Sequence, residues 1–537
     1  MTDTRLYLKP NVQVEPLVDQ WYAWTHLIPP ATAARNITGR HLKIMDSYVN
    51  APQIHANAVK NPAMRGGPFI DYDGKRVGEI RALRDRTKAQ LAPLIALSGA
   101  LAELDDLLCA KAKGHSLQPL YPEVPDILRG YVELVYDLRN HPSFRLIEPL
   151  LYASPFYDTS AQAIALSTIT GDDRPFVLST PRLESNETLH LPWSFDDERI
   201  DTLFRLKSTP GSWRSIRDLL GLGDTEAARF PEFLTETPPQ QYDRYTGNGV
   251  RWRYFGHACI LIETANVSIL LDPVLSYTYE AEISRYTYAD LPEHIDYVLI
   301  THNHQDHVLF ETLLQLRHKV GRVVVPRNGL GCLQDPSLRL TLENSGFARV
   351  MELGELDRIE FEGGSITGLP FFGEHSDLAI GTKLAYLLRL GGQSLLFAAD
   401  SCNVEPRLYR HLHREAGDID VIFLGMECDG APLSWLYGPL LTQPMERGMD
   451  QSRRLSGSDY EQARALVEEF RCQQIYVYAM GQEPWLNYVM SIKYTEQSRP
   501  IVESNRLIED FRSRGMLAER LFGEKEILMG AAYERAF

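Results

Sequence analysis

Short apolar runs separated by turn residues fill the second half of the chain. Most are only a few residues long and rich in Val, Ile, Leu, Phe and Tyr, which favours β-strands over helices. We therefore predict strands at Arg251–Phe255, Cys259–Ile262, Val267–Leu271, Tyr297–Ile300, Arg322–Val325, Ile359–Phe361, Leu384–Leu390, Ser394–Phe397, Val421–Leu424 and Ile475–Tyr478.

Helical patterns lie between these runs. Leu309, Leu313 and Leu316 share one helical face. Ser458–Glu461 has the sequence of a capping box, and apolar residues at helical spacing follow it. Strands first and then strand–helix alternation indicate two packed sheets flanked by helices, an αββα sandwich.

The first half of the chain has a different texture. Val77–Leu108 and Val124–Leu138 have helix-like apolar spacing, and proline-rich loops punctuate the rest. A polar segment with a Pro-Pro pair and Gly-Asn-Gly, Thr235–Gly249, separates the two halves. Because a chain of 537 residues exceeds one hydrophobic core, we predict a mixed α/β N-terminal domain over 1–245 and the sandwich over 246–537.

Charge and cysteine content narrow the class of protein. The 55 basic and 71 acidic residues give a net charge of −16 with no long basic run, which argues against a nucleic-acid partner. The six cysteines are scattered without a C-x-x-C pair, a pattern typical of reduced thiols. No apolar signal core or membrane span is visible. We predict a soluble cytoplasmic protein with no membrane association.

The strongest chemical signal directly follows the strand at Tyr297–Ile300. The loop contains His302, His304, Asp306 and His307 within six residues. Sites in such sheets gather beyond the carboxyl ends of strands. His302 and His304 can grip one ion, while Asp306 and His307, which we place at the start of the next helix, point to a second. Imidazole and carboxylate are ligands for which zinc, iron and manganese compete.

This H-x-H-x-D-H loop resembles that of the metallo-β-lactamase superfamily. Asp272, which ends an earlier strand, resembles that superfamily's strand-end aspartate and is expected to orient the loop. Asp400 occupies the place of its metal-bridging aspartate. In the middle histidine slot stand two neighbours, Glu374 and His375, and either can be the ligand.

The chain departs from the hydrolases of that superfamily near its C-terminus. Its last histidines are His411 and His413, inside a predicted helix, and the late strand at Ile475–Tyr478 leads into Ala-Met-Gly-Gln. The terminal histidine ligand is therefore missing. With Glu374 taken as ligand, three histidines and three carboxylates result, and hard oxygen donors favour iron over zinc.

In these departures the chain resembles the diiron β-hydroxylases of chloramphenicol and other nonribosomal peptide pathways. The resemblance implies that His302, His304 and Glu374 hold one iron, that Asp306 and His307 hold the other, and that Asp400 bridges them. It also implies two Fe ions as cofactor, dioxygen as co-substrate and an external electron donor. The expected substrate is an amino acid tethered as a thioester to the peptide carrier domain of a nonribosomal peptide synthetase. The resemblance further implies a homodimer, with carrier docking and dimerisation through the N-terminal domain.

Other interpretations remain at this stage. A dizinc hydrolase of an ester, amide or phosphodiester is the main alternative, and a binding protein with a degenerate site is another. Glu427 or Asp429 can meet a substrate amine, or both can be ordinary turn acids. His257 and Cys259 are predicted to be core residues. A basic cluster over Lys75–Lys88 suits either carrier docking or a solvated helix face.

Overall fold

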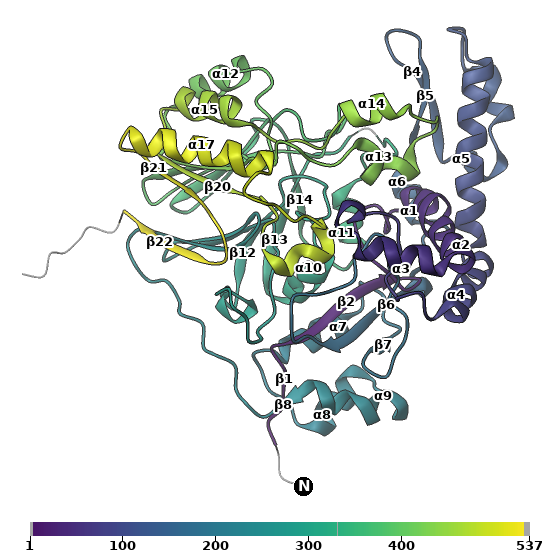
Figure 1. Ribbon diagram of the computed structural model, residues 1–537, viewed down its shortest axis with the longest axis horizontal. Helices are drawn as coiled ribbons and strands as arrows, with labels where there is room; N and C mark the ends of the chain where they lie inside the picture. Colours follow the sequence, from purple (N-terminus) through teal and green to yellow (C-terminus); the bar gives the residue numbers. More distant parts are fainter. Residues whose placement is uncertain (1–3, 330, 531–537) are drawn as a thin grey trace, which may run out of the picture.

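The computed structural model describes residues 4–329 and 331–530. The second half of the chain forms two seven-stranded sheets packed face to face (Figure 1). The first sheet has the order β14-β13-β12-β11-β10-β9-β22. Its strands are β9 (Val250–Gly256), β10 (Cys259–Glu263), β11 (Ser268–Leu271), β12 (Ile295–Leu299), β13 (Val320–Pro326), β14 (Val350–Leu353) and β22 (Lys525–Met529).

The second sheet runs β15-β16-β17-β18-β19-β20-β21. Its strands are β15 (Arg358–Phe361), β16 (Gly364–Leu369), β17 (Ala385–Leu390), β18 (Gln393–Phe397), β19 (Val421–Gly425), β20 (Gln474–Tyr478) and β21 (Leu517–Arg520). Every strand predicted from the sequence is present, and β14, β16, β21 and β22 are additional.

Three apolar layers hold the sandwich together. Aromatic side chains such as Trp252, Phe423 and Tyr476 pack edge to face or stacked between the sheets. The outer face of the second sheet is covered by α12 (Arg407–Ala416), α15 (Tyr460–Glu469) and α17 (Arg499–Ser513). The outer face of the first sheet packs on α10 (Phe310–Leu316) and on the N-terminal half of the chain. This is the predicted αββα architecture.

The N-terminal half is mixed α/β, as predicted. A four-stranded sheet of order β3-β2-β6-β7 contains β2 (Val12–Val18), β3 (Trp21–Tyr22), β6 (Gln162–Thr168) and β7 (Leu189–Leu191). Helices α1 (Pro30–Asn36), α2 (Leu42–Asn50) and α3 (Pro52–Lys60) lie in the chain between β3 and β6. A protruding arm is formed by α5 (Ala92–Lys111) and the hairpin of β4 (Val132–Tyr136) and β5 (Pro142–Leu146) (Figure 1).

Three local predictions need correction. The helix predicted over Val124–Leu138 is wrong, since the segment holds a short 3-10 turn and then β4, where buried and exposed residues alternate at the start of the strand. The helix predicted over Val77–Leu108 is two helices, α4 (Val77–Gln90) and α5, broken at Leu91 ahead of Pro93. The capping box of α15 uses Asp459 and Gln462, one residue later than predicted.

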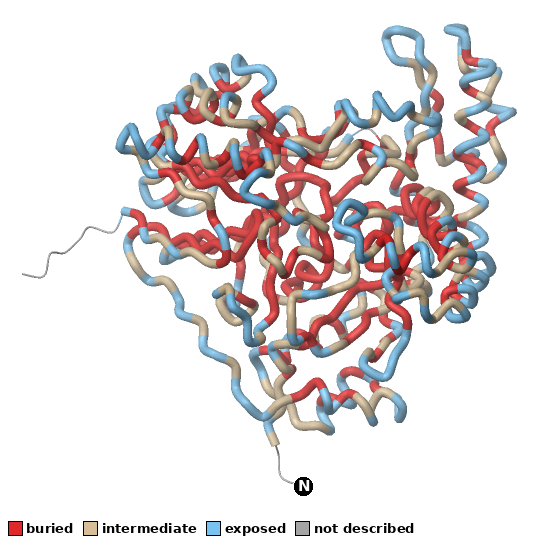
Figure 2. The backbone as a smooth tube through the Cα atoms, in the orientation of Figure 1, coloured by how far each residue is buried: buried red, intermediate tan, exposed pale blue. Residues whose placement is uncertain are grey.

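The segment between the two halves has no regular structure from residue 236 to β9. It begins after β8 (Leu234–Thr235), which pairs with β1 (Tyr7–Leu8), and it runs along the edge of the molecule as a largely exposed strap (Figures 1 and 2). We propose the domain division at 245/246 on this ground. One continuous hydrophobic cluster nevertheless joins the two halves, so they are not separate bodies.

No helix in 4–329 and 331–530 has the length and apolar character that a membrane crossing requires.

Candidate metal centre

The four parallel strands of each sheet end at one edge, and the predicted ligands gather there. The loop after β12 carries His302, His304, Asp306 and His307, while the segments after β16 and β18 carry Glu374 and Asp400. Their candidate ligand atoms fall into overlapping groups, each with all atoms within 4.8 Å of one another. One group contains His302, His304, Glu374 and His375, another His257, Asp306 and His307, and a third His302, His307 and Asp400.

Glu374 stands between two of the imidazoles. Its Oε1 lies 2.7 Å from Nδ1 of His304, and its Oε2 lies 3.6 Å from Nε2 of His302. Asp400 occupies the corresponding place between His302 and His307, since its Oδ2 is 3.8 Å and 3.1 Å from their Nε2 atoms. Distances of this size suit donor atoms that bind one metal ion between them, and not only direct hydrogen-bonded pairs.

A hydrogen bond on the far side of each ring fixes which nitrogen faces the cluster. Nδ1 of His307 donates to Oδ2 of Asp272 (2.8 Å), and Nδ1 of His302 donates to the Thr301 hydroxyl (3.0 Å). The Thr301 hydroxyl in turn donates to Asp272 (2.6 Å). For His304 the roles are reversed, because its Nε2 meets the Tyr437 hydroxyl at 3.0 Å and its Nδ1 faces Glu374. Such partners orient metal-binding imidazoles.

His257 belongs to this site, although the sequence predicted only a core residue. It is fully buried, and its Nδ1 accepts a hydrogen bond from the Gly481 N–H (3.2 Å). The ring proton of the neutral form therefore lies on Nε2, which donates to Oδ2 of Asp306 at 3.0 Å. We infer that His257 positions Asp306. In the sequence, the available signal for this role was the position of His257 in the turn after β9, directly following Gly256.

One further placement differs from the sequence expectation, and one choice that the sequence left open remains open. Asp306 and His307 lie in a turn ahead of α10, not at its first residues. His375 is buried beside Glu374, and its Nε2 has no hydrogen-bond partner among the described residues. Both neighbours therefore reach the cluster, and we propose Glu374 as the ligand. Gly373 (φ +82) makes this turn possible, since a Cβ there would lie 2.3 Å from Cβ of Cys402.

Backbone strain is concentrated at the strand ends around the cluster. Within two residues of the ends of β9, β11, β18 and β20, non-glycine residues have positive φ: His257 (52°), Asp272 (36°), Ala399 (49°) and Ala479 (52°). Glu374 (68°) shares this conformation. Each such residue costs on the order of 1–3 kcal/mol, and such strain accumulates at functional sites.

The donor set fits two cations. Nε2 of His302, Oε2 of Glu374 and Oδ1 of Asp400 are buried with no hydrogen-bond partner among the described residues, a costly state that bound cations would relieve. Burial raises the pKa of Glu374 to about 7 although His304 opposes the shift. Burial lowers the pKa of His302 well below its ordinary value, and the other histidines add to that shift. Neutral imidazoles and a cluster of carboxylates are what divalent ions require.

Asp272→Asn is expected to lower metal affinity about 10- to 100-fold. Asp272 accepts bonds from Thr301 N (2.7 Å), the Thr301 hydroxyl and His307, and an amide NH2 in its place would face the proton of His307. Titration of the purified chain with ferrous iron measures the change. Asp296→Asn is the matched control, because Asp296 makes similar bonds to Ser268 at the opposite end of the neighbouring strand. Equal losses in both variants would contradict the orienting role.

Comparison with known proteins identifies families and relatives that the chain resembles. Residues 7–238 match the family model of the diiron non-heme beta-hydroxylase N-terminal domain, and residues 251–429 match a beta-lactamase superfamily domain. The chain is 40% identical over 524 residues to the 4-amino-L-phenylalanyl-[CmlP-peptidyl-carrier-protein] 3-hydroxylase of Streptomyces venezuelae, covering 96% of this chain and 98% of that protein.

Solved structures agree with the sequence comparison. The crystal structure of CmlA, a diiron beta-hydroxylase from Streptomyces venezuelae, matches with a TM-score of 0.92 and 39% identity, covering 98% of this chain and 100% of that one. The structure of a mutant of the same beta-hydroxylase matches with a TM-score of 0.90, also at 39% identity and with the same coverage. The similarity thus extends over both halves of the chain.

Proposed function

The chain belongs to the family of diiron non-heme β-hydroxylases, and from that premise we propose that it hydroxylates the β-carbon of an amino acid held as a thioester on a peptidyl carrier domain. The observation that carries this proposal is the donor set. Three imidazoles and three carboxylates converge, and the strand that would bring a terminal histidine in hydrolases, β20 (Gln474–Tyr478), is followed by Ala479, Met480 and Gly481.

The ligand roles are part of the proposal. His302, His304 and Glu374 would hold one iron, Asp306 and His307 the other, and Asp400 would bridge them. The position of Asp400 between His302 and His307 supports the bridge. Glu374 supports the first set through its contacts with both His302 and His304. His257, Asp272, Thr301 and Tyr437 hold the ligands in place.

A bound iron pair supplies the means to activate dioxygen with two electrons from an external donor. The overall reaction converts one β C–H bond, O2, two electrons and two protons into C–OH and water. The protein positions the ligands and restricts access of water to them. His302 and His307 are wholly buried, and the Phe371 ring lies edge-on to the His302 ring, with the two ring centroids 6.0 Å apart.

Glu427 is the acid that we propose for the α-ammonium of the aminoacyl group. Burial and the charges of Asp400 and Asp306 raise its pKa well above the ordinary value. A cationic substrate group would compensate the negative charge of the Glu427 carboxylate. Asp429, the other candidate, is exposed and pairs with Arg454 at 3.3 Å.

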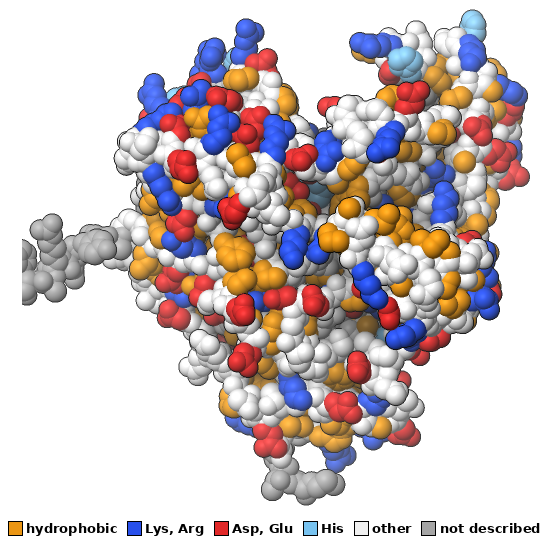
Figure 3. All heavy atoms as spheres, in the orientation of Figure 1, with side chains coloured by type: hydrophobic (Ala, Val, Ile, Leu, Met, Phe, Trp, Pro, Cys, Tyr) orange, Lys and Arg blue, Asp and Glu red, His pale blue; other side chains and the backbone are white. Residues whose placement is uncertain are grey.

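The N-terminal domain is proposed to receive the carrier. It already supports the site, because Arg40 of that domain donates to the Trp435 carbonyl (2.7 Å) and the Leu436 carbonyl (3.1 Å) of α13 (Leu433–Tyr437), the helix that ends in Tyr437. The basic cluster over 75–88 is a weaker docking candidate, since Arg76, Arg84 and Lys88 pair with neighbouring acids. Figure 3 likewise shows basic and acidic side chains interspersed.

Further partners belong to the same proposal. An external reductase or ferredoxin-like protein would supply electrons, and a homodimer would form through the protruding arm, whose hairpin tip carries the fully exposed Leu138. Light scattering of the purified chain tests the dimer. All six cysteines are free thiols, which suits a reducing compartment, and we propose the cytoplasm.

Single-turnover mass spectrometry of a loaded carrier tests the main proposal. The carrier bears 4-amino-L-phenylalanine, the residue named for the Streptomyces relative, or phenylalanine as an analogue. We expect the tethered residue to gain the mass of one oxygen atom, with little turnover of the free amino acid, because carrier binding positions the β-carbon. An Asp400→Ala chain and an oxygen-free reaction are the controls.

The same measurement separates the alternatives. A dizinc hydrolase would release the amino acid and leave an unloaded carrier, without any gain of oxygen on the tethered residue. Equal rates on free and tethered amino acid would refute carrier recognition while leaving the hydroxylase chemistry intact.

A further inference from the structure

A large cavity lies at the end of the sandwich opposite the metal centre. Its volume is 1540 Å³, and it is enclosed by the exposed strap before β9, the first strand pair and the segments that lead into β11, β12 and β13. Asp296, at the start of β12, lines it, whereas His302 follows the end of that strand. His302 is six residues beyond Asp296. At a rise of about 3.3 Å per residue along a strand, the cavity lies about 20 Å from the metal ligands.

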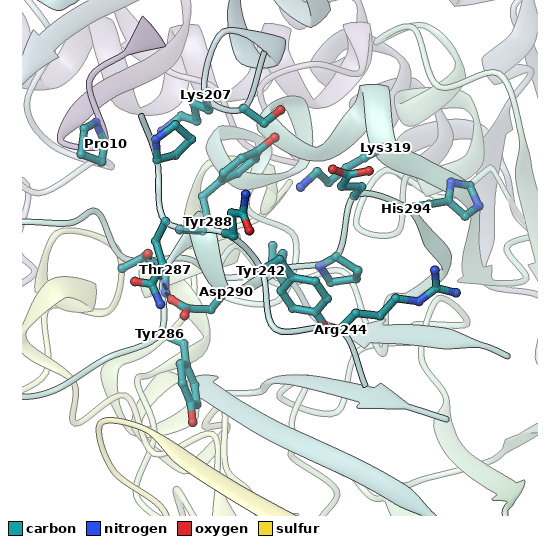
Figure 4. Close-up of a pocket in the computed structure, with 18 of the residues that line it drawn as sticks. Pro10, Lys207, Tyr242, Arg244, Tyr286, Thr287, Tyr288, Asp290, His294 and Lys319 are labelled. Carbon is teal, nitrogen blue, oxygen red and sulfur yellow. Dashed lines mark hydrogen bonds between the residues drawn. The ribbon is translucent and has the colours of Figure 1, made fainter. Parts of the chain in front are cut away.

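Two lysines are buried in the wall of this cavity without an anionic partner. Lys207 and Lys319 are 6% and 7% exposed, and neither forms a hydrogen bond or ion pair through its ammonium group within the described chain. Both border Tyr288, with Nζ atoms 5.3 Å and 4.1 Å from the ring centroid. Figure 4 shows Lys207, Tyr288 and Lys319 together on one side of the cavity.

Further basic groups lie near the same ring. His318 contacts the Tyr288 hydroxyl through Nε2 at 3.1 Å, but burial and the charges of Lys319 and Arg205 lower its pKa to about 3, so its imidazole is neutral. The charge of Arg205 also reaches Tyr288. Burial lowers the pKa of Lys207 to about 7 and that of Lys319 to about 8, and Lys319 adds to the shift at Lys207. The ammonium groups are thus destabilised as the protein stands, and an anion would relieve both.

Most of the carboxylates that line the cavity bind other groups of the protein. Glu263 pairs with Arg251 at 2.9 Å, Asp290 accepts from Thr287 N at 2.8 Å, and Asp296 accepts from Ser268 N at 2.9 Å. Glu293 acts on Lys319 through its charge but forms no ion pair with it in the part of the chain that the structure describes. Two buried ammonium groups without an ion pair among the described residues are unusual in a chain of net charge −16, and a purely structural wall would be met by apolar side chains.

We propose that this cavity binds a phosphorylated small molecule, with the phosphate between Lys207 and Lys319 and an aromatic or apolar portion against Tyr288 and Tyr242. Lysine ammonium groups donate to phosphate oxygens in charge-assisted hydrogen bonds. Tyr242 belongs to the strap and borders the same space (Figure 4). The site is separate from the metal centre, so its ligand is distinct from the carrier-tethered substrate.

Isothermal titration of the iron-loaded enzyme with phenyl phosphate tests the proposal. We expect saturable binding that phenol, which lacks the phosphate, does not reproduce. Lys319→Gln should raise the Kd at least about tenfold, since charge-assisted hydrogen bonds contribute on the order of 1.5–3 kcal/mol. The matched control is Lys43→Gln on α2, an exposed lysine outside the cavity, which should leave the Kd unchanged.

Hydrogen exchange locates the ligand, with protection expected over 205–208, 287–291 and 317–320. Arg205→Gln, an exposed residue at the mouth of the cavity, serves if the Lys319 variant does not fold, and it should also weaken binding. Absence of saturable binding would overturn the proposal. So would equal Kd values for the wild type and the lysine variant, equal binding of phenol, or a perturbed iron absorption spectrum with protection confined to the metal loop.

Discussion

The Glu374→Ala enzyme is expected to bind about one iron where the wild type binds two, and to hydroxylate at least about 100-fold more slowly. Loss of groups that merely orient a ligand costs about 10- to 100-fold, and loss of a ligand should cost at least as much. The carboxylate also supplies negative charge between two imidazoles, His302 and His304, which alanine cannot replace. Iron analysis together with single-turnover hydroxylation of a loaded carrier measures both effects.

His375→Ala is the matched control for this result. His375 is buried beside Glu374, and its Nε2 also lies in the cluster. We expect the His375 variant to keep both irons and most of its rate. Should Glu374→Ala retain full activity while His375→Ala abolishes it, the ligand is the neighbouring histidine, and the carboxylate-rich character of the site is lost with it.

Arg174→Ala should destabilise the protein by about 3–5 kcal/mol, the usual cost of leaving a buried charge without its partner. Arg174 bridges Glu15 on β2 and Glu311 on α10, with both contacts at 2.8 Å and all three side chains buried. Burial opposes the charge of Glu15, but Arg182 and Arg174 hold its pKa at about 2. Glu311 depends on Arg174 and on hydroxyls such as those of Tyr22 and Tyr277.

Urea unfolding compares this variant with Arg506→Ala. Arg506 is half exposed and pairs with Glu503 one helical turn away, so its removal should cost less than about 1 kcal/mol. Coincident unfolding midpoints for the two variants would show that the Arg174 bridge contributes no more than a surface pair. The expected difference would show that the N-terminal domain stabilises α10, the helix that follows the histidine loop.

Local patterns predicted the sandwich and most of the residues that the structure gathers in the candidate metal centre. The histidine loop is continuous in sequence, and each of the ten predicted strands was short, apolar and bounded by turn residues. The pattern did not predict β14, β16, β21 or β22. Glu374 and His375 were not separable, because adjacent residues in an irregular turn carry no periodicity that shows which one points inward. The error at Val124–Leu138 has a related cause, since the alternation of Val132, Leu134 and Tyr136 was too short to outweigh the helix-like spacing.

Contacts between distant segments were beyond the sequence. His257 reaches Asp306 only because β9 and β12 lie in one sheet, and Tyr437 reaches His304 across the site. The bridge from Glu15 through Arg174 to Glu311 likewise depends on how the halves pack. Such residues look like ordinary core or turn positions until the fold brings them together.

The strained strand ends also restrict how this enzyme can drift through mutation. Ala399 and Ala479 have φ near +50°, a conformation that glycine, asparagine and aspartate tolerate and β-branched residues do not. From an alanine codon, glycine and valine are each one base change away. The first change would be neutral or would relax the backbone, whereas the second would displace Asp400 or the turn that holds His257. Positions of equal burial therefore differ in which substitutions they tolerate, because the backbone conformation and not the side-chain environment sets the limit.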